Sequence, residues 1–156
     1  MAMRRIVTGS DERGRSYLVS DAAPPGAAGF GELWQSEGGD ALACAPSAGG
    51  PPVRLEPAPG GSSWRVFELP PDEVVAAYLA SQNAPEIEAS GFHRTDTLDY
   101  VMILDGEVTL ELDRGSVALG PGDCVVQRAT RHAWRNRSGR PVKMAVVMIR
   151  LPAARS

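Results

Sequence analysis

Residues 92–136 read FHRTDTLDYVMILDGEVTLELDRGSVALGPGDCVVQRATRHAWRN, and this stretch decides the fold. Short apolar segments in it are separated by tight turns at Asp105-Gly106, Arg114-Gly115 and Gly120-Pro121-Gly122. Between the first two turns, residues 107–113 alternate between apolar and polar side chains, which is typical of a strand buried on one face. Strands this short and evenly spaced predict an antiparallel β-sandwich or barrel.

The only two histidines of the chain, His93 and His132, lie near the two ends of this stretch, each beside a short apolar segment. This placement predicts a small polar site in the mouth of a barrel. Residues two apart on a strand share a face, so Thr95 is expected beside His93, and Trp134 beside His132. Trp134 either forms a pocket wall that stacks on an aromatic ring or is an ordinary core residue.

The flanking sequence predicts further strands around this central stretch. The ranges expected to be strands are 5–7, 16–20, 32–36, 63–69, 98–104, 107–113, 124–127, 132–136 and 142–151. Trp34 is expected to pack inward. In residues 98–104, Asp99 shares one face with Val101 and Ile103, whereas Tyr100 lies on the opposite face and is expected to pack against a second sheet or the N-terminal arm.

One helix and one long excursion interrupt the strands. Asp72 near the start and Pro85 after the end predict a helix over residues 72–81. Its apolar residues form one stripe and are Val74, Val75, Tyr78 and Leu79. Residues 38–61 are rich in Gly, Pro, Ala and Ser, which predicts a surface excursion with a short strand at 53–55. We expect the helix and the excursion to cover the barrel mouth or to form a dimer interface.

The composition excludes several classes of function. The chain has 156 residues and a net charge of -3, which favours one domain over 1–156 and argues against a general nucleic-acid binder. No apolar run approaches the roughly 20 residues that span a bilayer, so no membrane partner is expected. The N-terminus lacks an apolar signal-peptide segment, which favours a cytoplasmic protein. Cys44 and Cys124 have no metal-binding spacing and are expected to be reduced thiols.

The motifs of the central stretch resemble those of the cupin family. The first cupin motif, G-x5-H-x-H-x3,4-E-x6-G, corresponds to His93-x-Thr95-x3-Asp99-x6-Gly106. Thr95 stands where the family has its second histidine, and Asp99 stands where it has glutamate. The residues that match the second motif are Gly122 at its start, Gln127 and Ala129 at its Pro and Gly positions, and His132-x3-Asn136 at its end.

This resemblance implies a double-sheet jelly-roll barrel that is commonly a homodimer. The barrel would comprise residues 63–151, preceded by an N-terminal arm and excursion over 1–62. It also implies a divalent metal (Fe, Mn, Ni, Zn or Cu), which cupins often hold with three histidines and one glutamate. Many small bacterial cupins act on aromatic, polyketide, sugar or organic-acid substrates, and others only bind small molecules.

The residue types agree with a metal site at His93, Asp99 and His132. A divalent cation prefers imidazole and carboxylate ligands, and two histidines plus one carboxylate form the facial set typical of non-haem Fe(II). The hydroxyl of Thr95 is a poor metal ligand but a good partner for bound water or substrate. Without a metal, Asp99 beside His93 and His132 would still be a candidate acid/base group, because burial raises the pKa of a carboxyl.

Three functions therefore remain open from the sequence. The first is a metal-dependent enzyme, an oxygenase, decarboxylase or cyclase acting on a small organic substrate, with His93, Asp99 and His132 as catalytic and metal residues and with Thr95 and Trp134 contacting the substrate. The second is a binding module without turnover, and the third is a metal-free acid/base cyclase or isomerase. The arginines 128, 131, 135, 137 and 140 form either a solvated edge or a rim that attracts an anion.

Overall fold

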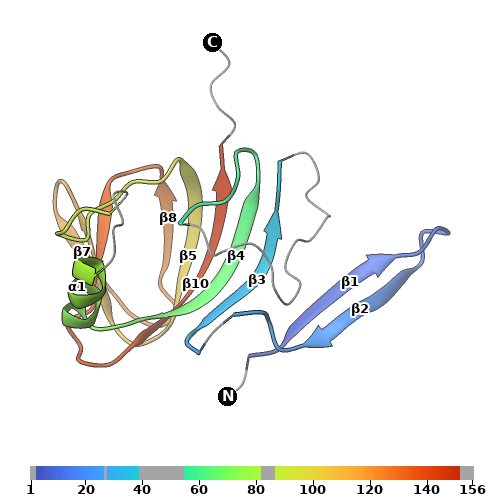
Figure 1. Cartoon of the computed structure of the whole chain (residues 1–156), viewed down its shortest axis with the longest axis horizontal. Coiled ribbons are helices and arrows are strands. Elements are labelled where there is room, and N and C mark those ends of the chain that lie inside the picture. Colours follow the sequence, from blue (N-terminus) through green and yellow to red (C-terminus); the bar gives the residue numbers. More distant parts are fainter. Residues whose placement is uncertain (1–2, 27, 39–54, 82–86, 152–156) are drawn as a thin grey trace, which may run out of the picture.

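The computed structural model describes residues 3–26, 28–38, 55–81 and 87–151 and consists mainly of antiparallel β-sheet with one short helix (Figure 1). The helix α1 spans Asp72–Ser81. The strands in chain order are β1 Arg5–Ser10, β2 Ser16–Ala22, β3 Phe30–Ser36, β4 Ser62–Leu69, β5 Thr97–Asp105, β6 Val108–Leu112, β7 Ser116–Leu119, β8 Cys124–Arg128, β9 His132–Arg135 and β10 Val142–Arg150. The prediction of an antiparallel jelly-roll barrel with a short helix is confirmed.

Two sheets face each other and form the barrel. One has five strands in the order β3-β4-β10-β5-β8, and the other has three in the order β7-β6-β9. The buried apolar residues between the sheets come from β5, β6 and β10 and include Val101, Ile103, Val108 and Met144. Among the residues that the structure describes, strands β1 and β2 pair only with each other, and they project away from the barrel as a hairpin (Figure 1).

The alternation of β5 determines what faces the barrel interior. Asp99, Val101 and Ile103 are 5%, 5% and 1% exposed, whereas Tyr100 and Met102 on the opposite face are 47% and 45% exposed. The expected inward face of this strand is confirmed. The expectation that Tyr100 packs against a second layer is wrong, because its side chain lies on the outer face of the five-stranded sheet and is half exposed.

Trp34 also differs from expectation. It pairs across β3 and β4 with Trp64, so the two side chains share a face. Trp64 is 48% exposed and neighbours the inward-facing Arg65 along β4, so both tryptophans lie on the outer face. An irregularity in register between Glu32 and Trp34 accounts for the change, since it shifts the alternation that placed Trp34 inward.

The hairpin turn at Gly106 requires glycine for two reasons. Its φ of 87° lies in the left-handed region, which side chains rarely adopt. A Cβ atom at this position would also lie 3.0 Å from a side-chain carbon of Val142 and 3.2 Å from its Cα. The turn that joins β5 to β6 therefore depends on a missing side chain next to the first residue of β10.

Helix α1 begins at a contact with the end of β9. The backbone N–H of Asp72 donates to the carbonyl of Asn136 at 2.9 Å, and the N–H of Asn136 donates to Oδ1 of Asp72 at 2.7 Å. The Asn136 side chain is fully buried and donates to the carbonyls of Leu69 and Arg140 at 2.9 and 2.7 Å. Asn136, the last residue of the second motif, therefore joins the start of α1 to the end of β4 and to the loop before β10.

The apolar residues of α1 do not act as one buried stripe. Val75 and Leu79 are half-buried and line a cavity, whereas Val74 and Tyr78 are 51% and 62% exposed. The four residues lie on one side of the helix, but only the Val75 and Leu79 edge of that stripe faces the cavity.

Some predictions fall partly or wholly outside the described residues. Cys44, the 53–54 part of the expected strand and residues 39–54 of the excursion lie there, and Cys124 is a free, exposed thiol. Two expected strands are longer than predicted, because β2 extends to Ala22 and β3 begins at Phe30. Within the part of the chain that the structure describes, no helix is both long and apolar enough to cross a membrane.

Candidate functional site

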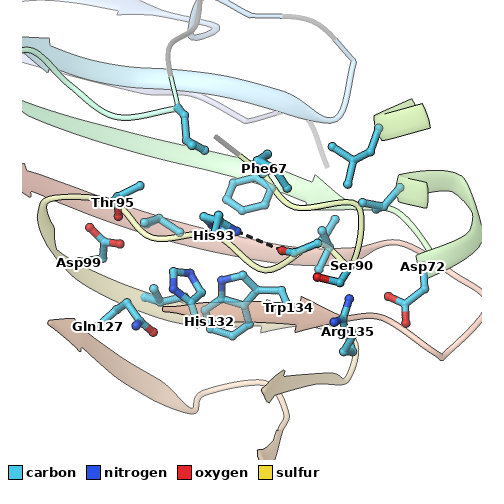
Figure 2. Close-up of a pocket in the computed structure, with 18 of the residues that line it drawn as sticks. Phe67, Asp72, Ser90, His93, Thr95, Asp99, Gln127, His132, Trp134 and Arg135 are labelled. Atoms are coloured by element: carbon cyan, nitrogen blue, oxygen red, sulfur yellow. Dashed lines mark hydrogen bonds between the residues drawn. The ribbon is translucent and has the colours of Figure 1, made fainter. Parts of the chain in front are cut away.

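A cavity of about 340 Å³ lies between the two sheets under α1 (Figure 2). Its walls are largely apolar, and the residues that form them include Phe67, Leu69, Val101, Val146, Met148 and Trp134. Helix α1 contributes Val75, Ala76 and Leu79, which agrees with the expectation that the helix covers the barrel mouth. The polar lining includes both histidines and Asp99, as the sequence predicted for a site inside the barrel.

His93 and His132 are brought together by the backbone. They form an isolated antiparallel bridge in which each N–H donates to the other's carbonyl, at 3.0 and 2.9 Å. Directly opposed residues of such a bridge place their side chains on the same face. The centroids of the two imidazole rings are accordingly 4.4 Å apart, with the ring planes inclined by 54°.

Both imidazoles are oriented by backbone carbonyls. Nδ1 of His93 lies 3.2 Å from the carbonyl of Gly91, and Nδ1 of His132 lies 2.9 Å from the carbonyl of Thr130. A carbonyl only accepts hydrogen bonds, so each Nδ1 carries the proton and each Nε2 retains a lone pair. Such a carbonyl contact is the usual outer support of a metal-binding histidine.

Burial keeps both histidines neutral. It lowers the pKa of His132 to about 4, against a smaller raising effect of the Thr130 carbonyl, and His93 adds a further lowering. Burial also lowers the pKa of His93. Neutral imidazole is the form that binds metals and accepts protons, so the pair is ready for either role at pH 7.

Asp99 is buried deep in the cavity, and burial raises the pKa of its carboxyl. A hydrogen bond from Thr97 and the charge of Arg65 oppose this effect, and the charge of Glu56 adds to it. Oδ1 of Asp99 is fully buried and has no hydrogen-bond partner among the described residues. A carboxyl in this state readily holds a proton or accepts a donor from a ligand.

Thr95 and Trp134 also line the cavity, as predicted. The hydroxyl of Thr95 lies 2.7 Å from that of Thr97, so one of its hydrogen bonds is made to this neighbour. Trp134 meets His132 edge-on, with ring centroids 6.1 Å apart, and forms part of the wall, so the pocket-wall alternative describes its position.

Two more site residues are Arg65, which the sequence analysis did not name, and Gln127, which it named only as a motif position. Arg65 is 7% exposed, lines the cavity and donates from Nε to Glu32 at 2.9 Å. Gln127 is 3% exposed, pairs across strands with Asp99 and donates to the carbonyl of Thr130. Arg65 lies two residues before Phe67 on β4, and residues two apart on a strand share a face. This spacing could have predicted a charged side chain on the inner face.

The donor types suit a divalent metal, but the protein ligand set is incomplete. Two neutral imidazoles and an unpartnered carboxylate oxygen are the groups such an ion takes. Yet no three His, Cys, Asp or Glu side chains converge as a metal-binding group among the described residues. His93 and His132 therefore fit as two ligands, and the assignment of Asp99 as a third remains a prediction.

Four of the five arginines between residues 128 and 140 contact acidic residues. Arg131 pairs with Glu88 at 2.7 Å and with Asp113 at 2.5 Å. The other ion pairs of this group are Arg135 and Arg137 with Glu111, Arg137 with Asp72, and Arg140 with Asp105. These pairs favour the solvated-edge interpretation, because the partner carboxylates already offset most of the positive charge. Arg135 also lines the cavity, where its guanidinium is paired with Glu111.

Comparison with known proteins identifies a matching family over the centre of the chain. Residues 82–149 match the family model described as "Cupin domain". Residues of the chain are also similar to "Phomopsin biosynthesis cluster protein C'" of Diaporthe leptostromiformis, with 42% identity over 81 residues, 51% of this chain and 35% of that protein. A further relative is "Cupin-domain-containing oxidoreductase fogC" of Aspergillus ruber, 40% identical over 70 residues, 42% of this chain and 34% of that protein.

The chain spans about a third of the length of these curated relatives. Among solved structures, it is similar to an RmlC-like cupin family protein with a double-stranded β-helix fold from Methanocaldococcus jannaschii. That similarity has a TM-score of 0.42 and 18% sequence identity, and it covers 57% of this chain and 70% of the other.

Proposed function

Residues 82–149 of this chain form a cupin domain, and we propose that this domain is an enzyme that acts on a small organic molecule in its cavity, with a divalent metal bound by His93 and His132. The observation that carries the proposal is the pair of neutral imidazoles, 4.4 Å apart, at the wall of a largely apolar cavity. A cavity of about 340 Å³ suits a small substrate of the aromatic, polyketide-like or carboxylic-acid type.

The proposed reaction class is an oxidation or a related metal-assisted conversion. Relatives that match this chain are named cupin-domain-containing oxidoreductases, which supports this class over a binding module without turnover. A two-histidine site with further open positions also suits the binding of a substrate oxygen or of dioxygen. When bound, the metal would polarise a substrate oxygen or activate dioxygen, and Fe, Mn, Ni, Zn and Cu are the candidates.

The roles of the surrounding residues follow from their contacts. The carbonyls of Gly91 and Thr130 hold the two imidazoles in the tautomer that leaves Nε2 free. Trp134 and Phe67 supply apolar walls that would orient a ring and exclude water. Asp99, with its raised pKa and unpartnered Oδ1 within the described structure, would hold or accept a proton at that atom.

Metal analysis tests this proposal directly. The untagged protein, purified without a chelating column, is expected to contain close to one equivalent of Fe, Mn, Ni, Zn or Cu. His132→Ala should lose the metal, whereas Arg128→Ala, a change at an exposed residue of β8, should keep it. A wild-type protein that contains no metal and binds none on addition would contradict the metal-dependent proposal.

The state of Asp99 favours a second candidate, an acid/base cyclase or isomerase that needs no metal. Burial is the main cause of its raised pKa, and a carboxyl that holds its proton more tightly than usual can serve as a general acid or base in the cavity that the two imidazoles also line. Carbon-13 NMR of labelled aspartate carboxyls, with Asp99→Asn to assign the signal, should give a pKa above the ordinary value. A pKa at or below that value would eliminate this candidate.

A further inference from the structure

Residues 87–93 form a short strap that closes on itself beside the cavity. Its ends are joined by an isolated antiparallel bridge between Ile87 and His93. Within the strap, the N–H of Glu88 donates to the carbonyl of Phe92 at 2.9 Å. Most residues of the strap line the cavity, so its position determines part of the wall of the site.

His93 takes its orientation from this strap. It lies before β5 and outside the strands, and its Nδ1 lies 3.2 Å from the carbonyl of Gly91, two residues earlier in the strap. The N–H of Gly91 is held in turn by the carbonyl of Glu88, at 2.7 Å. His132, by contrast, belongs to β9, and its backbone is fixed by the pairing of that strand with β6. A movement of the strap would therefore change the orientation of His93 more than that of His132.

Arg131 holds the outer side of the strap. Its Nε and Nη2 donate to the two carboxylate oxygens of Glu88, at 2.8 and 2.7 Å. Its guanidinium carbon lies 4.1 Å from the centre of the Phe92 ring, and its Nη1 donates to Asp113, just after β6, at 2.5 Å. One side chain thus connects both halves of the strap to the three-stranded sheet.

These contacts differ from those of an ordinary surface ion pair. An isolated exposed pair contributes little to stability, because the ordering of two long side chains offsets the attraction. Here the planar guanidinium binds the Glu88 carboxylate with two parallel hydrogen bonds and also stacks on an aromatic ring. Such a combination fixes direction as well as distance, and a lysine side chain could not reproduce it.

We propose that Arg131 is a positioning residue for His93. It holds the strap, and the strap holds the imidazole so that Nδ1 keeps its proton and Nε2 stays free. The inference rests on the proposed function, which takes His93 as a metal ligand. The expected effect is selective, because His132 is placed by β9 and does not depend on the strap.

Nitrogen-15 NMR of the imidazole rings tests the proposal on the metal-free protein at about pH 8, above the ordinary histidine pKa of about 6.5. The chain has only two histidines, so His93→Gln and His132→Gln assign their signals. The wild type is expected to hold both rings in the Nδ1–H form. Arg131→Ala should give His93 a mixture of the two neutral forms and leave His132 unchanged, because the hydrogen bond of each ring decides which nitrogen carries the proton.

Three further variants separate geometry from charge. Glu88→Ala should reproduce the effect from the other side of the contact. Arg131→Lys keeps the charge but loses the planar, two-pronged group, so it should resemble Arg131→Ala. The matched control is Arg140→Ala, which removes another exposed arginine that pairs with a carboxylate, and it should leave both rings as in the wild type. Circular dichroism and thermal unfolding check that each variant is folded, and Arg131→Lys replaces Arg131→Ala if the latter is not.

Calorimetric titration with Zn²⁺ gives a second measurement. Loss of the outer support of a metal-binding histidine typically lowers metal affinity by about 10–100-fold, so Arg131→Ala should bind Zn²⁺ at least about tenfold more weakly than the wild type. An unchanged affinity for Zn²⁺ would overturn the proposal.

Two NMR results would also overturn it. One is a His93 ring that keeps a single form in Arg131→Ala or in Glu88→Ala. The other is an equal change at His93 and His132, which would indicate a general loosening of the barrel. If the wild type binds no Zn²⁺, the metal-dependent function fails, whereas the NMR comparison still decides the role of Arg131.

Discussion

Lowering the pH from 7 to 5 is expected to destabilise the metal-free protein by about 2 kcal/mol through His132 alone. In the fold, burial lowers the pKa of this imidazole to about 4, from an ordinary 6.5. The unfolded chain therefore binds a proton on this group near pH 6.5, whereas the native state does not. Below pH 6.5 the unfolded state binds more protons than the native state, so the free energy of unfolding falls as the pH falls toward 4. Burial of His93 lowers the free energy of unfolding in the same direction.

Urea unfolding at pH 7, 6 and 5 measures this effect after treatment with a chelator and a check that no metal remains. His132→Gln removes the titrating group and keeps a polar side chain of similar size. His93 and Asp99 titrate in both proteins, so the comparison of the two pH dependences isolates His132. If wild type and variant lose the same free energy of unfolding between pH 7 and pH 5, the burial argument for His132 is wrong.

Three further substitutions test the fold and the site by urea unfolding. Asn136→Ala should cost about 2–3 kcal/mol, because two backbone carbonyls lose their donor, and a loss below 0.5 kcal/mol would contradict the structural role of this side chain. Asp99→Asn should stabilise the protein at pH 7. Because the pKa of Asp99 is raised in the fold, its stabilising contribution is present at acid pH and is lost as the pH rises, and Asn carries no such dependence. An unchanged stability would contradict the raised pKa. Gly106→Ala should cost more than Gly115→Ala, because both have φ near 90° but only the first crowds Val142, and equal losses would refute that crowding.

The residues of the site could be predicted from the sequence to different degrees. His93, Thr95, Asp99, His132 and Trp134 were selected from spacing and family resemblance, and all five line the cavity. Asp99, His132 and Trp134 face the cavity because of strand parity, which is a local property of the chain. His93 and Thr95 lie before β5, outside the strands, and His93 is placed by its bridge to His132. Whether Asp99 completes a metal site depends on distances between strands that are far apart in sequence, and parity alone does not determine such distances.

Asn136 and Arg65 illustrate what local patterns leave out. Asn136 is the end of a motif, but its contacts with Leu69 and with the start of α1 join segments more than 60 residues apart. Arg65 is tolerated on the inner face because Glu32, from an adjacent strand, offsets its charge. Neither the carbonyl partners of Asn136 nor the carboxylate partner of Arg65 could be chosen from the sequence, since many carbonyl and acidic groups were available.

The sequence by itself determined the strands, the glycine turns and the two faces of each strand, because alternation and left-handed turn positions are set by residues close together in the chain. Only the tertiary structure decided which faces are covered. Tyr100 and Trp64 are as large and apolar as core residues. They are nevertheless half exposed, because the second sheet and α1 lie against the other face of the five-stranded sheet. Burial depends on what packs against a face, and that packing is a property of the whole fold.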